Sequence, residues 1–307
     1  MSATRRPTDL AASVRARLLD VSRRRGLEFQ LVLSDFAIER LLYRIGVSAH
    51  SEHLVLKGAM LLKLWSADRH RATWDLDLLG RGPNTVASVE SILRDLCAID
   101  GADAILFDPA SIAGEEIRAA DEYAGVRVRL EAHLAGARIP VQVDVGFDDA
   151  IVPLPTRENY PTLLDHAPPR ILAYPREAVV AEKLEAMVTL GVTNSRMKDF
   201  YDVHLLASSF AFDGPPLARA IQATFQRRGT PLPDSRPLVL TREFLAAPER
   251  ETQWRAFLRR GRLDGPPDAG RLAESLQQFL APLLGAIAHR ETFSKHWPPS
   301  GPWTPRI

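Results

Sequence analysis

Two aspartates separated by one residue, Asp75 and Asp77, lie in the apolar segment 74–79. Residues i and i+2 of a strand project from the same face, so this segment predicts two adjacent carboxylates, with the intervening leucines turned into the core. A further aspartate, Asp144, lies in a second apolar segment, 139–147. Carboxylates on neighbouring strands supply the oxygen ligands that Mg²⁺ takes together with phosphate oxygens and water. We therefore expect Asp75, Asp77 and Asp144 to form a Mg²⁺ site, although such pairs also occur on solvated strand edges.

A glycine turn precedes the paired aspartates. The apolar segment 53–57 predicts a strand, which Gly58 interrupts before the helical run 60–65. Backbone N–H groups at the start of a helix can hold phosphate groups. We expect the turn formed by Lys57, Gly58 and Ala59 to bind the triphosphate of an NTP, which points to nucleotidyl transfer.

Two polar residues, Arg71 and Thr73, stand four and two positions before Asp75. Thr73 would share the face of the two aspartates, where its hydroxyl could contact phosphate or be modified to block the site. The alternative is that threonine stands here for its strand propensity alone. We include both residues among the expected NTP-binding positions.

Four motifs in order resemble those of one protein family. They are LVLKGAMLL at 54–62, RATWDLDLLG at 71–80, AEKLEA at 181–186 and NSRMKDFYD at 194–202. Their order is similar to that of the DNA polymerase β-like nucleotidyltransferases, and their detail resembles the AbiEii/AbiGii toxins. Members of that family are the toxins of type IV toxin–antitoxin and abortive-infection systems, and include MenT-type toxins that modify tRNA. The chain departs from the superfamily at Ala59, where Gly or Ser is usual, and in a slightly long segment, 60–74.

The resemblance implies further catalytic residues beside the three aspartates. Lys183 would bind triphosphate oxygens as a point charge, and Asp199 and Asp202, which share a helix face, would orient Lys183 or the nucleotide base. Alternatively, Lys183 lies on a solvated helix face, and Asp199 pairs with Arg196 or caps its helix. Asp144 could bind a second Mg²⁺ or act as the base toward the acceptor hydroxyl.

The apolar periodicity predicts an α+β fold in two domains. Residues 1–155 would form a small mixed sheet with helices, in which two N-terminal helices precede the sheet, and the resemblance implies that this is a polymerase β-like nucleotidyltransferase core. Residues 156–307, after a proline-rich boundary, would form a mainly helical domain that completes the active-site cleft. The expected helices are 27–45, 86–97, 177–190, 198–208 and 272–287, and the further expected strands are 125–134 and 139–147, joined by a hairpin at Gly136. The tail from residue 297 is expected to be irregular.

Composition excludes several classes of protein. The chain has 307 residues, of which 46% are hydrophobic and 25% charged, as in an ordinary globular protein. It shows neither a signal peptide nor a run of 18 apolar residues, so we expect a cytoplasmic protein without a membrane partner. A lone Cys97 cannot form an internal disulfide, and His50 and His53 lack the further ligands of a zinc site.

Positive charge gathers in the C-terminal third. From residue 203 onward there are 14 Lys and Arg against 9 Asp and Glu, whereas the whole chain has a net charge of +1. Six arginines could form a basic surface for a polyanion such as RNA, or a solvated helix face. They are Arg227, Arg228, Arg255, Arg259, Arg260 and Arg262.

Together these observations predict a nucleotidyltransferase that uses Mg²⁺ and an NTP. The resemblance implies the 3′ end of tRNA as the acceptor and a cognate antitoxin as the partner. One alternative is transfer to a small molecule or a protein side chain, and another is a non-catalytic nucleotide-binding regulator. A basic groove would favour RNA, and a closed acidic pocket would favour a cationic small molecule.

Overall fold

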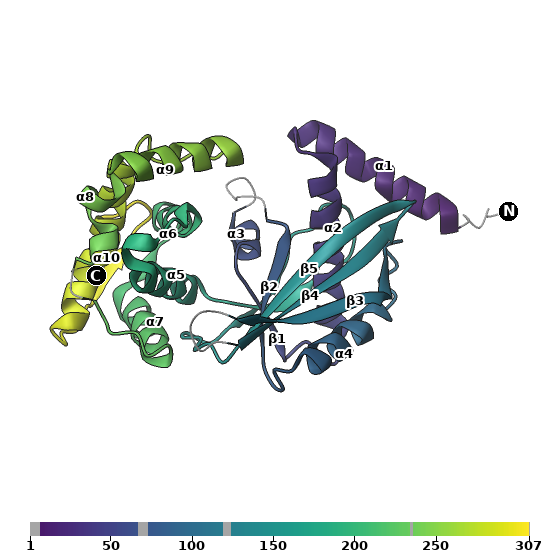
Figure 1. Ribbon diagram of the computed structural model, residues 1–307, viewed down its shortest axis with the longest axis horizontal. Coiled ribbons are helices and arrows are strands. Elements are labelled where there is room, and N and C mark those ends of the chain that lie inside the picture. The colour runs from purple at the N-terminus through teal and green to yellow at the C-terminus, as the bar shows by residue number, and fades with distance from the viewer. Residues whose placement is uncertain (1–6, 67–72, 119–123, 234–235, 307) are drawn as a thin grey trace. The chain divides into compact units, whose positions relative to one another are not determined.

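A computed structural model of the chain describes residues 7–66, 73–118, 124–233 and 236–306 (Figure 1). The structure divides into two compact units. The first, here called the sheet unit, comprises Met1–Asp148 and Thr156–Ala173. The second, here called the helical unit, comprises Asp149–Pro155 and Tyr174–Ile307.

The sheet unit combines helices with a mixed sheet (Figure 1). Its helices are α1 (Pro7–Arg25), α2 (Phe29–Val47), α3 (Met60–Trp65) and α4 (Val86–Cys97). Its strands are β1 (Leu54–Lys57), β2 (Asp75–Gly80), β3 (Leu106–Arg118), β4 (Ala124–Leu134), β5 (Ala137–Phe147), β6 (Thr156–Asn159) and β7 (Arg170–Ala173). Within the described residues these strands form one sheet in the order β3-β4-β5-β2-β1-β7-β6. The pairs β2–β5 and β1–β7 are parallel, and the remaining neighbours are antiparallel.

Strands β4 and β5 form the hairpin that the sequence predicts. Ala135 and Gly136 both have positive φ, +46° and +80°, as the tight turn of a two-residue hairpin requires. Along β4, Val126 and Val128 are buried, whereas Arg127 between them is partly exposed. This alternation gives the sheet one apolar and one polar face.

Helices α2 and α4 pack against the sheet. Leu78 of β2 and Val143 and Val145 of β5 line a small cavity together with Val89 and Leu93 of α4. The apolar side chains of both strands therefore point toward α4. The polar side chains that alternate with them lie on the opposite face, where the candidate site is found.

The division between the units differs from the predicted boundary after residue 155. Residues 156–173 belong to the sheet unit, because β7 pairs with β1 and β6 extends the sheet beyond β7. Two hydrogen bonds join the segment between β6 and β7 to α2. Leu163 N donates to Glu39 Oε2 at 2.6 Å, and Arg40 Nη2 donates to Ala167 O at 2.9 Å. The prolines interrupt this segment without separating it from the sheet.

The helical unit contains the remaining elements. Its helices are α5 (Arg176–Leu190), α6 (Met197–Ser209), α7 (Gly214–Arg227), α8 (Arg242–Leu245), α9 (Pro248–Gly261) and α10 (Ala269–Ala288), with short 3₁₀ turns at Gly191–Thr193 and Leu238–Leu240. A second, small sheet contains β8 (Phe212–Asp213), β9 (Lys295–Trp297) and β10 (Thr304–Pro305). In the described parts of both units, no helix combines the length and apolar character needed to cross a membrane.

The C-terminal tail is more regular than the sequence indicates. β9 pairs with β8 and β10, and the Trp297 indole donates to Ala207 O at 2.7 Å. Trp303 stacks on Phe279 with ring centroids 5.8 Å apart. Aromatic packing on the helices therefore orders a segment whose prolines suggest irregular structure.

The predicted α+β class, with a mixed sheet followed by a mainly helical part, is confirmed. The predicted helix 86–97 coincides with α4. Strand β3 was missed, because a register shift between Asp108 and Ala113 breaks its alternation.

Candidate active site

The turn between β1 and α3 leaves room for an aspartate side chain. Gly58 has a φ of +73°, a left-handed conformation that favours glycine. A Cβ atom at this position would lie 2.0 Å from Oδ2 of Asp77 and 2.7 Å from its Cβ. The absence of a side chain at Gly58 therefore makes the space in which the Asp77 carboxylate lies.

Two backbone N–H groups at the start of α3, directly after this turn, are already engaged. Leu61 N donates to Gly58 O at 3.3 Å, and Leu62 N donates to Ala59 O at 3.0 Å. Ala59 itself is buried. The glycine turn forms as expected, and its binding of a triphosphate stays a prediction.

The paired aspartates lie on the polar face of β2. Leu76 and Leu78 are 0% and 1% exposed, whereas Asp75 and Asp77 are half-buried. The predicted orientation of this strand is confirmed. Both carboxylates therefore combine access to solvent with a fixed position on a strand at the centre of the sheet.

A row of charged residues crosses the polar face at the level of Asp77. Lys57 of β1 is the register partner of Asp77, Asp144 of β5 is its partner on the other side, and Arg127 of β4 is the partner of Asp144. We call Lys57, Asp77, Asp144 and Arg127 the charged row. Neighbouring strands lie about 4.8 Å apart, so two like charges meet at its centre with a cation at each end. Each of the two central carboxylates disfavours the charged form of the other, and an ion that bridged them would relieve this repulsion.

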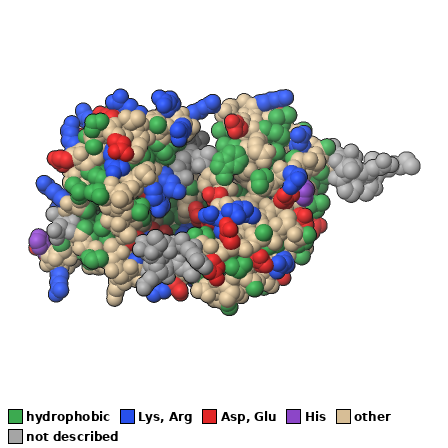
Figure 2. All heavy atoms as spheres, viewed as in Figure 1, with side chains coloured by type: hydrophobic (Ala, Val, Ile, Leu, Met, Phe, Trp, Pro, Cys, Tyr) green, Lys and Arg blue, Asp and Glu red, His purple; other side chains and the backbone are tan. Residues whose placement is uncertain are grey.

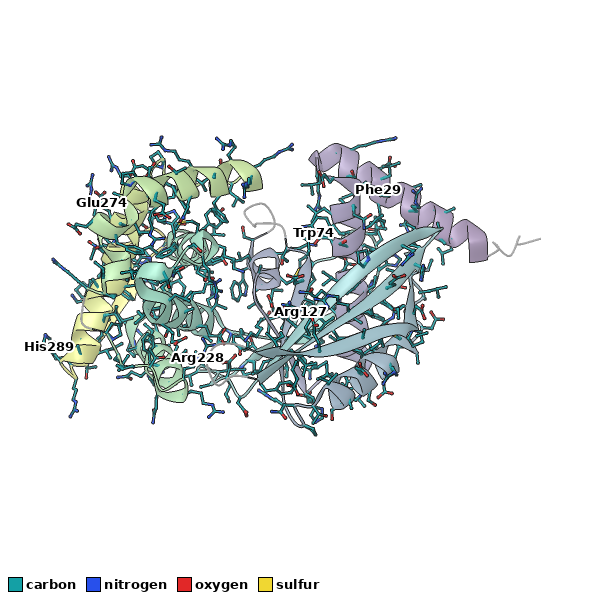
Figure 3. The ribbon with its side chains drawn as sticks, viewed as in Figure 1. Phe29, Trp74, Arg127, Arg228, Glu274 and His289 are labelled. Atoms are coloured by element: carbon teal, nitrogen blue, oxygen red, sulfur yellow. The ribbon has the colours of Figure 1, made fainter. Side chains whose placement is uncertain are left out.

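Arg127 holds Asp144 in a bidentate ion pair. Its Nε donates to Oδ1 at 2.8 Å and its Nη2 donates to Oδ2 at 2.7 Å. The hydrogen bonds that Arg127 donates to this carboxylate raise the pKa of the guanidinium above its usual range, so it stays charged. Figure 3 marks Arg127 over the strands of the sheet unit.

Sequence reasoning did not assign a role to Arg127. Apolar and polar residues alternate strictly in VRVRLE at 126–131, which predicts that Arg127 lies on the polar face of a strand but does not indicate which residue it faces. Only the register of β4 against β5 brings it to Asp144. A predicted hairpin at Gly136 could have supplied that register, because a two-residue turn fixes which residues face each other.

The residues of this face fit a magnesium ion in part. Asp75 and Asp77 provide hard oxygen ligands of the kind that Mg²⁺ takes together with substrate phosphates and water. Both oxygens of Asp144 are engaged by Arg127 instead, and in the described ranges no group of three or more His, Cys, Asp or Glu side chains converges as a metal site would. Each oxygen of Asp144 keeps a further lone pair, so as a third ligand Asp144 would share its charge between the metal and Arg127.

Two further predicted positions lie next to this strand. The Thr73 hydroxyl is 3.5 Å from the backbone oxygen of Asp75, a long contact, and its side chain is half-buried. Arg71 lies outside the described residues. The roles predicted for both positions stay predictions.

In the helical unit, Lys183 lies between two buried carboxylates. Its Nζ is 3.0 Å from Oδ1 of Asp199 and 2.7 Å from Oδ2 of Asp202. Arg196 Nε contacts the other oxygen of Asp199 at 2.7 Å. The lysine side chain is 14% exposed and the two carboxylates 2% and 0%. Both acids therefore contact Lys183, as expected if they orient it. Asp199 also pairs with Arg196, as the alternative prediction stated.

Arg228 does not belong to a basic surface as expected. Its guanidinium contacts Glu185 Oε2 at 2.6 Å and Asp149 Oδ1 at 3.0 Å, with Glu182 Oε1 at 3.9 Å. These carboxylates are mostly buried, and Arg228 itself is 20% exposed. The prediction for Arg228 was wrong, because tertiary packing places it among acids of its own unit. Figure 3 labels Arg228 in the helical unit.

The other arginines of the expected basic surface lie at the end of α7 and on and just after α9, and Arg227 of α7 is exposed. Arg259, Arg260 and Arg262 are exposed, and Arg255 pairs with Glu251 of the same helix at 2.5 Å. Figure 2 shows Lys and Arg side chains over α9 at the upper left. Of the six arginines expected to form a basic surface, all but Arg228 are therefore exposed.

A family model and two solved structures match this chain. A family model described as nucleotidyl transferase AbiEii toxin, type IV TA system, matches residues 40–282. The crystal structure of JHP933 from Helicobacter pylori has 15% sequence identity and a TM-score of 0.48, and the match covers 86% of this chain and 94% of that one. A candidate nucleotidyltransferase from H. pylori also has 15% identity, with a TM-score of 0.46 and coverage of 87% and 100%. Comparison with curated protein sequences gave no match.

The family match spans most of the chain. It includes the glycine turn, β2 with its paired aspartates, β5 with Asp144, and the helices that carry Lys183 and its two acids. The chain therefore belongs to the AbiEii family, the nucleotidyltransferase toxins of type IV toxin–antitoxin systems.

Proposed function

We propose that this toxin catalyses the Mg²⁺-dependent transfer of a nucleoside monophosphate from an NTP to the 3′ end of tRNA, and that a cognate antitoxin holds the resulting growth arrest in check. The observation that carries the proposal is the charged row, with Asp75 beside it on the same strand face. Two acids side by side at a glycine turn suit a metal that is shared with phosphate groups.

In the proposed reaction a hydroxyl oxygen of the acceptor attacks the α-phosphorus of the NTP. A new P–O bond forms, the bond to the β-phosphate oxygen breaks, and pyrophosphate leaves with its electron pair. Bound Mg²⁺ would neutralise charge on the phosphates, and Asp75 and Asp77 would hold it. Lys57 would add positive charge beside them, and the hydroxyl proton would pass to Asp144 or to water.

Arg127 would act as a positioning residue in this scheme. Its bidentate pair fixes the plane and rotamer of Asp144 on the polar face. Asp144 would serve either as the base toward the hydroxyl or as a metal ligand. Replacing Arg127 by lysine keeps the positive charge and loses the bidentate hydrogen bonding. This substitution therefore separates the effect of the charge from the effect of holding Asp144 in one orientation.

Lys183, Asp199 and Asp202 stay predicted catalytic residues, with Lys183 directed at triphosphate oxygens. Their support is the family motif on which they lie and the way in which two buried carboxylates hold one ammonium group. Because breaking such a cluster also affects folding, their substitution needs a stability measurement beside the activity.

The test is transfer of label from each NTP in turn to total cellular RNA in the presence of Mg²⁺. We expect label in tRNA-sized material with the wild-type protein, and none with Asp75→Asn or Asp77→Asn, which remove a charge from half-exposed positions without altering the core. Asp95→Asn, an exposed carboxylate of α4, serves as the matched control. Label in protein alone would favour transfer to a side chain, and no label with bound NTP would favour a nucleotide-binding regulator.

A further inference from the structure

A hollow opens on the polar face of the sheet directly beside the paired aspartates. Its volume is about 440 Å³, and Asp75, Trp74, Gln142 and Arg129 are among the residues that line it. Arg129 is the register partner of Gln142, and Gln142 is the partner of Asp75. The hollow therefore lies on the face of the charged row, two residues further along each strand.

Trp74 presents a large aromatic surface to this hollow. Its side chain is 46% exposed, although it directly precedes a strand whose leucines are fully buried. An exposed indole beside a polar site offers a flat face on which a nucleobase can stack, and such stacking tolerates any base. Figure 3 labels Trp74 in the sheet unit.

The polar side chains of the hollow suit the remaining parts of a nucleotide. Arg129 pairs with Glu115 at 2.9 Å, but both side chains are more than half exposed, so the pair is weak and can exchange for a phosphate. Gln142 Nε2 lies 3.5 Å from Asp144 Oδ2, a long contact that leaves its carboxamide able to bond to a base edge. The volume lies within the range of small-molecule binding sites.

We propose that this hollow binds one unpaired nucleotide, with its base stacked on Trp74, its edge near Gln142 and its phosphate near Arg129. The inference rests on the proposed function, since it gives the acid pair a nucleotide on which to act. Two sources share this chemistry: the NTP itself, and the terminal nucleotide of an RNA acceptor.

The experiment compares Trp74→Ala, Trp74→Phe and a control, Leu106→Ala, by binding alone. Leu106 is 71% exposed on β3 of the same unit and does not line the hollow. One arm titrates each NTP with Mg²⁺ and without acceptor. The other arm titrates a short, labelled single-stranded RNA in EDTA without NTP, so that no transfer takes place.

We expect Trp74→Ala to weaken binding at least about fivefold in one arm, and Trp74→Phe to keep it within about twofold, because a phenyl ring still stacks. A loss with NTP assigns the hollow to the base of the NTP, and a loss with RNA assigns it to the acceptor. Unchanged affinity in both arms, or an equal loss in Leu106→Ala, overturns the inference. If nucleotide binding depends on Trp74 but the protein shows no transferase activity, the proposed function is refuted and this inference still holds.

Discussion

Replacing Gly58 by alanine tests whether the glycine turn exists to seat the Asp77 carboxylate. The left-handed φ of +73° costs an alanine about 1–2 kcal/mol. The added Cβ would also lie 2.0 Å from Oδ2 and 2.7 Å from Cβ of Asp77, and relief of such an overlap typically costs about 1–3 kcal/mol. Because the Cβ of Asp77 is involved, rotation of the carboxylate alone cannot remove the overlap.

Gly136→Ala is the matched control for this substitution. Gly136 has a φ of +80° in the same unit, and a Cβ there would meet nothing within 4 Å. Its substitution therefore carries the same backbone strain without the overlap. At about 2–4 °C per kcal/mol for a unit of this size, we expect Tm to fall by roughly 2–8 °C in Gly136→Ala and by roughly 4–20 °C in Gly58→Ala.

The two variants should separate clearly in nucleotide transfer. Displacing a reacting group by about 1 Å can cost on the order of 100-fold in rate, so we expect that loss in Gly58→Ala and near-normal transfer in Gly136→Ala. Both are assayed well below their Tm, with circular dichroism as the check on folding. Transfer by Gly58→Ala within about threefold of the wild type would refute the reasoning. An equal loss in Gly136→Ala would attribute the effect to backbone strain.

Three further predictions concern charges. Lys183→Ala removes the cation between two buried carboxylates and should destabilise the helical unit by about 3–5 kcal/mol, whereas Lys183→Arg keeps the charge and more of the NTP use. An unchanged Tm in Lys183→Ala would show that the cluster is not stabilising. Burial raises the pKa of Glu39 to about 7, so its protonated form stabilises the fold at acid pH and the stability is lost as pH rises through 7. In thermal unfolding, the wild type should therefore lose on the order of 3 kcal/mol of stability between pH 4.5 and 7, and Glu39→Gln should lack this loss. A pH profile of Glu39→Gln that equals that of the wild type would contradict this. Replacing Arg259 and Arg260 by alanine should reduce the slope of log RNA affinity against log salt by about 1.4 if each contacts one phosphate of a single strand, with the exposed Arg290→Ala as control. An unaltered slope would show that these arginines only face solvent.

Local sequence patterns were sufficient for much of the sheet unit. The placement of Asp75 and Asp77 on one face follows from the two-residue period of a strand, and the turn at Gly58 follows from the conformational freedom of glycine. The hairpin at Gly136 and helix α4 are local in the same sense. Each depends on residues within a few positions of one another, so the printed sequence contains what is needed to predict it.

The pairing of segments that are distant in the chain could not be predicted from local sequence patterns. Alternation showed that Arg127 lies on a polar face, but only the register of β4 against β5 decided that it holds Asp144. Likewise, β7 belongs to the sheet unit because it pairs with β1, and Arg228 contacts its carboxylate partners because of the packing of its own unit.

The sequence by itself determined which side chains share a face of a strand or helix, because neighbouring residues are joined by a backbone of fixed geometry. The tertiary structure decided which faces meet. Burial of apolar surface, which drives that packing, is non-directional and acts between segments far apart in the chain. The acid pair could therefore be predicted from the sequence, whereas Arg127 and the hollow beside Trp74 required the folded chain.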